Sequence, residues 1–278
     1  MSADVGEGTA GEQAFRHAMR DVCTRRNLRT VFQPVVSICT GDVVGFEALS
    51  RGPSDHPLEP AEELLEAAAR AGMSRELNAT LAWLARVRAR QRIADDGTLL
   101  FINLDADCFH AGTSSIFDWD GDPFWPLDRT VIELTERRPV ADVSQLVELR
   151  EYARDRGARF ALDDAGAGYA GLCVLEALRP DFIKVDAELS RDCDSNTTKQ
   201  AIISSLVYIA DHTGAEVIVE GIETMEELRT MRSLGVDLVQ GFLLGSPEEL
   251  PANLTGVRWM RRDRRAVAQS PREVAAIA

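Results

Sequence analysis

The sequence has no long apolar run and few cysteines. No apolar stretch approaches the roughly 18 residues that a membrane-spanning helix needs, and the N-terminus lacks the apolar core of a signal peptide. The cysteines are odd in number, and no two of them form a C-x-x-C pair. This pattern argues against a disulfide framework or a zinc site and favours reduced thiols in the cytoplasm. The cysteines are Cys23, Cys39, Cys108, Cys173 and Cys193.

Positive charge is also scarce. The formal net charge is −14, and only two of the 31 basic residues are lysines, Lys184 and Lys199. A chain this acidic is a poor partner for nucleic acid polymers and for anionic membrane surfaces, because both attract basic proteins. If the substrate is a phosphate ester, bound cations have to offset the repulsion locally.

The sequence does contain a series of short apolar runs that each end in polar residues. Runs of this kind, rich in β-branched residues, are typical of buried parallel strands. In a closed α/β barrel the C-terminal strand ends meet on one face, where catalysis takes place. With 278 residues, the chain is close to the roughly 250 residues typical of one (β/α)₈ barrel. The runs end at Glu47, Asn103, Glu133, Asp163-Asp164, Lys184 to Asp186, Glu220 and Gln240.

The predicted order of elements departs from a simple barrel only at its start. The strands predicted over 28–37 and 43–50 are joined by the short turn Thr40-Gly41-Asp42, so they have to pair antiparallel. From Leu99 onwards strands and helices alternate, apart from a loop predicted over 111–127. We expect disorder over residues 1–11, a barrel domain over 12–255 and a basic tail over 256–278. Helices are predicted over 13–26, 61–71, 75–93, 143–156, 168–178, 197–212 and 225–234.

The polar residues at the strand ends offer oxygen ligands and include neither cysteine nor histidine. Such a set favours the hard cations Mg²⁺ and Mn²⁺ over zinc. The adjacent pair Asp163-Asp164 is more specific, because neighbouring side chains reach one site only where a strand is ending. One carboxylate could bridge two metals while the other binds the second, an arrangement used for in-line phosphoryl displacement. Each carboxylate alone could equally be a strand-end cap or a salt-bridge partner.

Three further features could contribute to such a site. Lys184 lies inside the apolar run 182–185, where a compact ammonium beside metals can hold a water or hydroxide better than arginine can. Arg51 follows the first strand end and suits phosphate recognition, although it could also be an ordinary surface arginine. The glycine-rich segment 164–171 could form a mobile loop, which by itself is a weak signal. Gln240 and Glu223 could instead be structural.

At these residues the sequence closely resembles the EAL family of cyclic di-GMP phosphodiesterases. The signature triplet is Glu47-Ala48-Leu49 itself, and the resemblance extends over roughly residues 28–247. Several motifs in the family's order make it specific, whereas a lone triplet would mean nothing. The motifs are FQPVVSICTGDVVGFEALSR around the triplet, FIN ending at Asn103, ELTE at Glu133–Glu136, DDAGAGYAGL at Asp163–Leu172, DFIKVD at Asp181–Asp186, VEGIET at Val219–Thr224 and DLVQGF at Asp237–Phe242.

The resemblance implies a modified TIM (β/α)₈ barrel with an antiparallel first strand. It also implies hydrolysis of cyclic di-GMP to linear pGpG with two Mg²⁺ or Mn²⁺ ions. Ca²⁺, which is larger and less strict in its geometry, is expected to inhibit. The implied partners are cyclic di-GMP and a second copy of the chain, in a homodimer formed beside the glycine loop.

The resemblance assigns a role to each site residue. The first metal would be bound by Glu47, Asn103, Glu133 and Asp163, and the second by Asp163, Asp164 and Glu220. Lys184 would hold the attacking water and Gln240 would order solvent beside it, with Glu47 and Glu220 completing the catalytic set. Gln33 and Arg51 would contact the nucleotide and its phosphate, and Asp186 a guanine. Glu136 and Glu223 would be supporting glutamates, with Glu136 steadying the glycine loop.

The sequence departs from the family pattern in three places. The glycine loop has Ala165 where the family has phenylalanine, and Ala170 and Gly171 where it has serines. Asp105 replaces a common serine, and the segment 52–72 is short. None of these changes removes an implied metal ligand or Lys184, so we expect an active enzyme. The main alternative is an EAL module that binds cyclic di-GMP as a receptor without hydrolysing it. An enolase-like lyase is a second alternative, but it would leave Asp164 and Glu220 unexplained.

Overall fold

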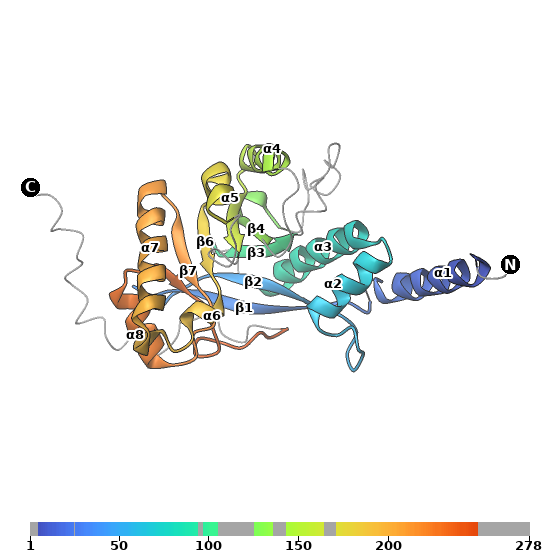
Figure 1. The fold of residues 1–278 in the computed structure, drawn as a ribbon, viewed down its shortest axis with the longest axis horizontal. Coiled ribbons are helices and arrows are strands. Elements are labelled where there is room, and N and C mark those ends of the chain that lie inside the picture. The colour runs from blue at the N-terminus through green and yellow to red at the C-terminus, as the bar shows by residue number, and fades with distance from the viewer. Residues whose placement is uncertain are drawn as a thin grey trace, which may run out of the picture.

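The computed structural model describes residues 5–24, 26–93, 97–104, 125–135, 143–163 and 171–249. Within these ranges the strands β1 to β8 close into a barrel in sequence order, with helices around it (Figure 1). This confirms the fold expected from the sequence. The strands are β1 Arg29–Ser37, β2 Val43–Arg51, β3 Leu99–Leu104, β4 Thr130–Thr135, β5 Arg159–Asp163, β6 Phe182–Val185, β7 Glu216–Val219 and β8 Leu238–Val239.

Strand β1 runs antiparallel to both of its neighbours, β2 and β8, whereas the other neighbouring strands are parallel. The tight turn after Ser37 enforces this pairing. Gly41 has a positive φ of 72°, and the Ser37 N–H donates to the Asp42 carbonyl at 3.0 Å. The register places Gln33 directly opposite Glu47, so this hairpin brings two of the expected site residues side by side.

The helices agree with the predicted ranges to within a few residues, apart from the first. Helix α1 spans Val5–Val22, so the disorder expected over residues 5–11 is corrected to helix, and the helix stops before Arg26. The glycines of this segment suggested disorder, but it contains no proline, and the buried Met19 packs the helix into a cluster with α2 and α3. The short helices α6 and η4 were not predicted. The helices after α1 are α2 Ala61–Arg70, α3 Ser74–Arg92, η3 Leu127–Arg129, α4 Val143–Arg154, α5 Gly171–Leu178, α6 Ala187–Ser190, η4 Cys193–Ser195, α7 Thr197–Thr213 and α8 Met225–Ser233.

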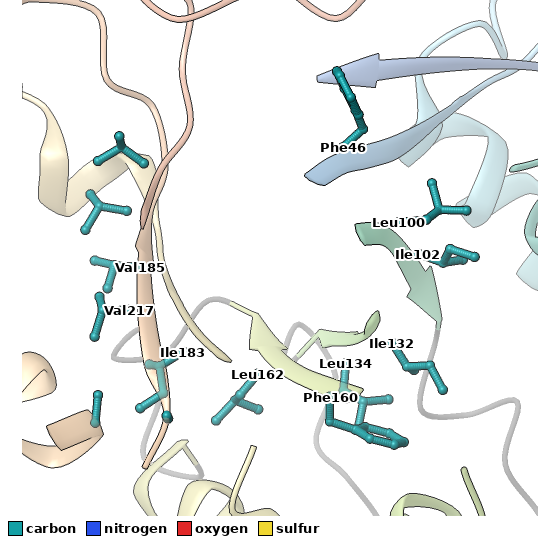
Figure 2. Close-up of a cluster of buried hydrophobic side chains, with 14 of the residues drawn as sticks. Phe46, Leu100, Ile102, Ile132, Leu134, Phe160, Leu162, Ile183, Val185 and Val217 are labelled. Carbon is teal, nitrogen blue, oxygen red and sulfur yellow. The ribbon is translucent and has the colours of Figure 1, made fainter. Parts of the chain in front are cut away.

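The outward faces of the strands pack against the helices. Side chains alternate along a strand, so every second residue points away from the barrel axis. These residues join apolar side chains of α3, α4, α5, α7 and α8 in the largest hydrophobic cluster. Figure 2 shows part of this cluster, including Phe46 of β2, Leu100 and Ile102 of β3 and Phe160 of β5.

The inward faces form a second, smaller apolar cluster, which we call the inner apolar layer. Glycine is required at position 45 on β2, because any Cβ there would lie 2.7 Å from the Phe101 ring. Phe101 and Phe182 meet edge to face, with ring centroids 5.4 Å apart. The layer fills the barrel beneath the C-terminal strand ends. Its members are Val35, Leu99, Phe101, Val131, Ala161, Phe182, Ile218 and Leu238.

Some predicted features lie outside the described residues. These include nearly all of the loop predicted over 111–127 and the first residues of the helix predicted from 168. The domain limits at residues 12 and 255 stay predictions. Of the helices within the described ranges, none combines the length and the apolar character needed to cross a membrane.

Candidate active site

Polar side chains follow the inner apolar layer, two residues further along the parallel strands. Because the side-chain period of a strand is two, these residues also point inward and meet in one layer, which we call the polar layer. All of them except Glu133 line a cavity of about 520 Å³, and Glu133 is fully buried. The polar layer consists of Gln33, Glu47, Asn103, Glu133, Asp163, Lys184, Glu220 and Gln240.

Lys184 lies at the centre of the polar layer and is 1% exposed. Its Nζ is 2.6 Å from Glu220 Oε1, 2.9 Å from Glu133 Oε1, 3.3 Å from Asp163 Oδ1 and 3.6 Å from Glu47 Oε1. Burial alone would lower the pKa of Lys184, but the four carboxylates outweigh it and raise this pKa well above its ordinary value. The side chain is therefore a charged ammonium in the folded protein.

The pKa values of the carboxyl groups around Lys184 are shifted in different directions. Burial, together with the charge of Glu47, raises the pKa of Glu133 well above its usual range. Burial also raises the pKa of Glu220 to about 7, against the opposing effect of Lys184. Burial would raise the pKa of Glu47 too, but the ammonium of Lys184 and hydrogen bonds from two side-chain amides lower it instead. One ammonium does not balance four carboxylates, so protons offset part of the excess negative charge.

Two side-chain amides orient Glu47. Asn103 Nδ2 donates to Glu47 Oε1 at 2.8 Å. Gln240 Nε2 donates to Glu47 Oε2 at 2.8 Å and to Gln33 Oε1 at 3.0 Å. Gln33 Nε2 in turn donates to the carbonyl of Gly245 at 3.1 Å. This chain of hydrogen bonds fixes both oxygens of Glu47 and connects the first strand to the last.

The donor set of the polar layer fits hard divalent cations, because its ligand atoms are carboxylate and amide oxygens. Oε2 of Glu133 and Oε1 of Gln240 are buried and accept no hydrogen bond from the described residues. Oε1 of Glu133 and Oε1 of Glu220 are also buried, and the Lys184 ammonium lies 2.9 and 2.6 Å from them. In the part of the chain that is described, no three Asp, Glu, His or Cys side chains already surround one point as a metal site. The ammonium of Lys184 lies among the carboxylates instead.

Only some of the predicted substrate-binding and supporting residues line the cavity. Arg51 donates from Nη1 to the carbonyl of Ser50 at 2.8 Å and is not among the described residues that line the cavity. Asp186 lines the cavity, and its Oδ1 caps α6 by accepting from the Glu188 N–H at 2.6 Å. Glu223 is exposed at the cavity rim. Asp164, Glu136 and the rest of the segment 164–170 lie outside the described residues.

The sequence analysis missed one wall of the cavity. Helices α2 and α3 contribute Leu65, Asn78 and Leu81, while Arg191 follows α6 and Phe242 follows β8. Of these residues only Phe242 belongs to a motif of the sequence analysis, and the part formed by α2 and α3 carries no motif, because it depends on how these helices pack together in a separate hydrophobic cluster.

Glu227 on α8 was also missed, although it holds two segments of the cavity. Its carboxylate accepts from the backbone N–H groups of Glu223 and Thr224 at 3.0 Å each, and from that of Asp192 at 3.1 Å. Burial would raise the pKa of Glu227, but these hydrogen bonds outweigh it and lower the pKa. The pattern Thr224-x-x-Glu227 is a capping-box signature, so the sequence did contain a signal for this residue.

Comparison with known proteins gives a family match over most of the chain. Residues 12–247 match the EAL domain. "Cyclic di-GMP phosphodiesterase PdeL" of Escherichia coli is 28% identical over 243 residues, which cover 83% of this chain and 64% of that protein. The chain spans between 30% and 64% of the length of three curated relatives that it matches, PdeL included.

Two similar solved structures are nucleotide complexes. BlrP1 of Klebsiella pneumoniae, in a manganese and cyclic di-GMP complex, matches with a TM-score of 0.71 and 33% identity, over 80% of this chain and 56% of that one. The PaMucR phosphodiesterase of Pseudomonas aeruginosa, in a cyclic di-GMP complex, matches with a TM-score of 0.75 and 26% identity, over 84% of this chain and 97% of that one. The barrel, the strand-end residues and the match over residues 12–247 agree, and the chain belongs to the EAL domain family.

Proposed function

We propose that this chain hydrolyses one phosphodiester bond of cyclic di-GMP to give linear pGpG. The observation that supports this most is the gathering of Lys184 and four carboxylates at the strand ends of the barrel. Lys184 and three of these carboxylates, all but Glu133, line a cavity of about 520 Å³, an ordinary volume for a small-molecule site. PdeL is named a cyclic di-GMP phosphodiesterase, and BlrP1 and PaMucR were solved with cyclic di-GMP.

We propose Mg²⁺ or Mn²⁺ as the cofactor, because the oxygen-only donor set fits these ions. BlrP1, solved with manganese and with calcium, supports a divalent-metal site. Two such ions, when bound, would supply an activated water and would stabilise the negative charge that develops on the phosphate. Glu133 and Glu220, whose pKa values are raised, would release protons on binding metal, so metal affinity should rise with pH. Glu47, Asn103, Glu133 and Asp163 would hold the first ion, and Asp163, Asp164 and Glu220 the second.

The remaining polar groups would position water. Lys184 has three N–H donors, and once its carboxylate partners bind metal the ammonium can hold the attacking water. Gln240 Oε1 is buried without a hydrogen-bond donor among the described residues, so it can accept from the same or a neighbouring water. Glu47 is already fixed by Asn103 and Gln240, so it needs no reorganisation when the reaction begins.

We propose Gln33, Arg51 and Asp186 as substrate contacts. Arg51 has to turn away from the Ser50 carbonyl to reach a phosphate. Asp186 uses Oδ1 to cap α6, and its Oδ2 can accept from the N–H groups of a guanine. Glu223 and Glu136 are proposed as supporting residues. A cytoplasmic location and a homodimer also stay proposals, drawn from the cysteine pattern and the family resemblance.

The test incubates the purified chain with cyclic di-GMP and Mg²⁺ or Mn²⁺ and separates the products by chromatography. We expect pGpG from the wild type, and none from Glu47→Gln, because that variant loses a metal-binding carboxylate with little change in size. Glu226→Gln is the matched control, since Glu226 is exposed on α8 and pairs with Arg229. With Ca²⁺ in place of Mg²⁺ we expect binding without turnover.

Two other outcomes have distinct meanings. Tight binding of cyclic di-GMP without pGpG in any of the three metals would establish the receptor function instead. The substitutions at Ala165, Ala170 and Gly171 in the glycine loop are the features that favour that alternative. Neither binding nor turnover would contradict the proposed function altogether.

A further inference from the structure

We propose that Arg191 binds the phosphate of the cyclic dinucleotide that is not being hydrolysed. This inference rests on the proposed function, because it names a further contact of the same substrate in the same cavity. Arg191 lines the cavity at the end of α6, and its side chain is exposed to the solvent of that cavity.

The charge balance of the cavity leaves one phosphate without a partner. A cyclic dinucleotide carries two phosphodiester groups, each with one negative charge, and the reaction engages only one of them at the polar layer. Among the described lining residues, Lys184 and Arg191 are the two cations. Lys184 is buried and paired with four carboxylates, and Arg51, proposed above for one phosphate, is not part of this lining. Arg191 is therefore the lining cation that can bind the other phosphate. The lining carboxylates are Glu47, Glu62, Asp163, Asp186, Glu220 and Glu223.

The backbone that carries Arg191 is fixed from several sides. The Arg191 N–H donates to the Ala187 carbonyl at 3.0 Å. The Arg191 carbonyl accepts from Lys199 Nζ at 2.6 Å, and the same ammonium donates to the Glu188 carbonyl at 2.5 Å. The second lysine of the chain therefore closes the C-terminal end of α6, where an ammonium is favoured by the helix dipole.

The residue after Arg191 is held in an unusual conformation. Asp192 has a φ of 54°, in the left-handed region that non-glycine residues rarely adopt. Its N–H donates to Glu227 Oε1, which ties this turn to the N-terminus of α8. Backbone strain of this kind persists where the surroundings over-determine it, and it is often found at ligand-binding positions.

A close contact sets the distance between this turn and the polar layer. Gly221 follows Glu220 directly, and a Cβ on Gly221 would lie 2.4 Å from the Cβ of Ala187. The loop after β7 and helix α6 therefore touch without room for a side chain between them. Arg191 therefore follows a short helix that contacts Gly221, the residue next to Glu220.

The guanidinium itself is suited to the task. The guanidinium makes no hydrogen bond or ion pair with the described residues, so binding a ligand need not break any such bond to that part of the chain. Its planar group presents paired N–H donors that match two phosphate oxygens. An exposed stem with a fixed backbone reaches into the cavity while losing only side-chain freedom on binding.

The test measures binding of cyclic di-GMP and of cyclic di-AMP by calorimetry in Ca²⁺, with chromatography to verify that neither is hydrolysed. The two ligands share their phosphates and differ in their bases. We expect Arg191→Gln to weaken both by the same factor, about tenfold to one-hundredfold, as for loss of a charge-assisted hydrogen bond. Arg191→Lys should weaken binding of both ligands less than Arg191→Gln does, because the positive charge is kept. Arg229→Gln removes an exposed arginine of α8 and is the charge-matched control.

Each remaining outcome overturns the inference in a recognisable way. If Arg191→Gln weakens the binding of cyclic di-GMP but not that of cyclic di-AMP, the side chain recognises the guanine and not the phosphate. If neither ligand is weakened relative to Arg229→Gln, Arg191 takes no part in binding. If Arg191→Gln and Arg191→Lys also lose Mn²⁺ binding measured with the metal alone, the residue acts on the fold of the site and not on the ligand. If the wild-type protein binds no cyclic di-GMP, the proposed function is wrong, and this inference, which rests on it, is wrong as well.

Discussion

The barrel interior has two layers that are built by the same strands but behave in opposite ways. In the inner apolar layer, side chains such as Phe101 and Phe182 are fully buried and packed against one another. Two residues further along, the polar layer buries Glu133 and Lys184 just as completely. Strand geometry therefore determines which side chains are in contact, and the residue types determine whether that contact stabilises the fold.

The energetic difference between the layers follows from desolvation. Burying a large apolar side chain contributes about 1.5–3 kcal/mol to stability. Burying a carboxylate costs several kcal/mol, and an ion pair offsets this only when its geometry and hydrogen bonds are good. The polar layer has four carboxylates for one ammonium and keeps buried oxygens without a donor from the described residues. The apolar layer and the outer core therefore hold together a site that is unfavourable on its own.

Lys184→Met tests the polar layer where we expect the largest effect. The variant keeps an apolar side chain of similar length but removes the only charge that partners the four carboxylates among the described residues. We expect the rate of pGpG formation to fall at least about a thousandfold, as for loss of a group that positions the nucleophile in a catalytic unit. Unfolding in urea without metal should show a loss of about 3–5 kcal/mol, because the carboxylates are left uncompensated.

Arg229→Met is the control for this variant, since it also replaces a cation by methionine, on the exposed face of α8. It should change the rate of pGpG formation less than about twofold and stability by less than about 0.5 kcal/mol. A Lys184→Met enzyme within about tenfold of the wild-type rate would contradict the role given to the ammonium.

Phe182→Ala tests the inner apolar layer on the same strand, two residues before Lys184. Removing the ring leaves a cavity beside Phe101, and we expect a loss of about 3–5 kcal/mol in the free energy of unfolding. The rate per folded molecule should stay within about tenfold, because no group of the polar layer is removed. Phe15→Ala is the control, since Phe15 is 37% exposed on α1 and its loss should have little effect on stability. If Phe182→Ala stayed stable but lost activity as Lys184→Met does, the two layers would not be separable.

The sequence was most informative where chain geometry leaves one choice. Parallel strands and a side-chain period of two place Asn103, Glu133, Lys184 and Glu220 in one layer. Each could be assigned from its position at the end of an apolar run or, for Lys184, inside one. The antiparallel first strand followed from a turn too short for any other pairing. These features depend on local pattern and on register alone.

The sequence was least informative where tertiary contacts decide. The wall formed by α2 and α3 depends on a hydrophobic cluster that also includes Met19 of α1, a contact that no sequence pattern marks. The hydrogen bond from Arg51 to the carbonyl of the preceding residue depends on the side-chain conformation, which the sequence does not specify. Helix α6 was missed because it has only four residues and its carbonyls are held by Lys199, eleven residues after Glu188. The pattern of a short helix is too brief to differ from that of a loop.

Glu227 supports the polar layer from outside the barrel, and replacing it is the prediction for which we expect the smallest effect. Its carboxylate accepts three backbone N–H groups from the two segments that flank Glu220 and Arg191. Glu227→Gln leaves one oxygen for three donors and adds an NH₂ group that faces them. We expect a loss of about 1–3 kcal/mol in the free energy of unfolding at neutral pH.

This stabilisation should depend on pH in a defined direction. Because the pKa of Glu227 is lowered in the folded protein, its contribution is complete above the ordinary glutamate range and is lost as the pH falls through the lowered value. In metal-free urea unfolding, the free energy of unfolding of the wild type should therefore exceed that of Glu227→Gln by the full difference near neutral pH, and by progressively less below about pH 4.5.

Glu226→Gln is the control, because it removes the same charge from the neighbouring position. The Glu226 side chain is exposed and pairs only with Arg229 among the described residues, so this variant should show almost no loss of stability at any pH. Equal losses for the two variants would mean that net charge, and not the three hydrogen bonds, sets the stability of this turn. A loss confined to Glu227→Gln and accompanied by weaker binding of cyclic di-GMP would show that the polar layer depends on this support from outside the barrel.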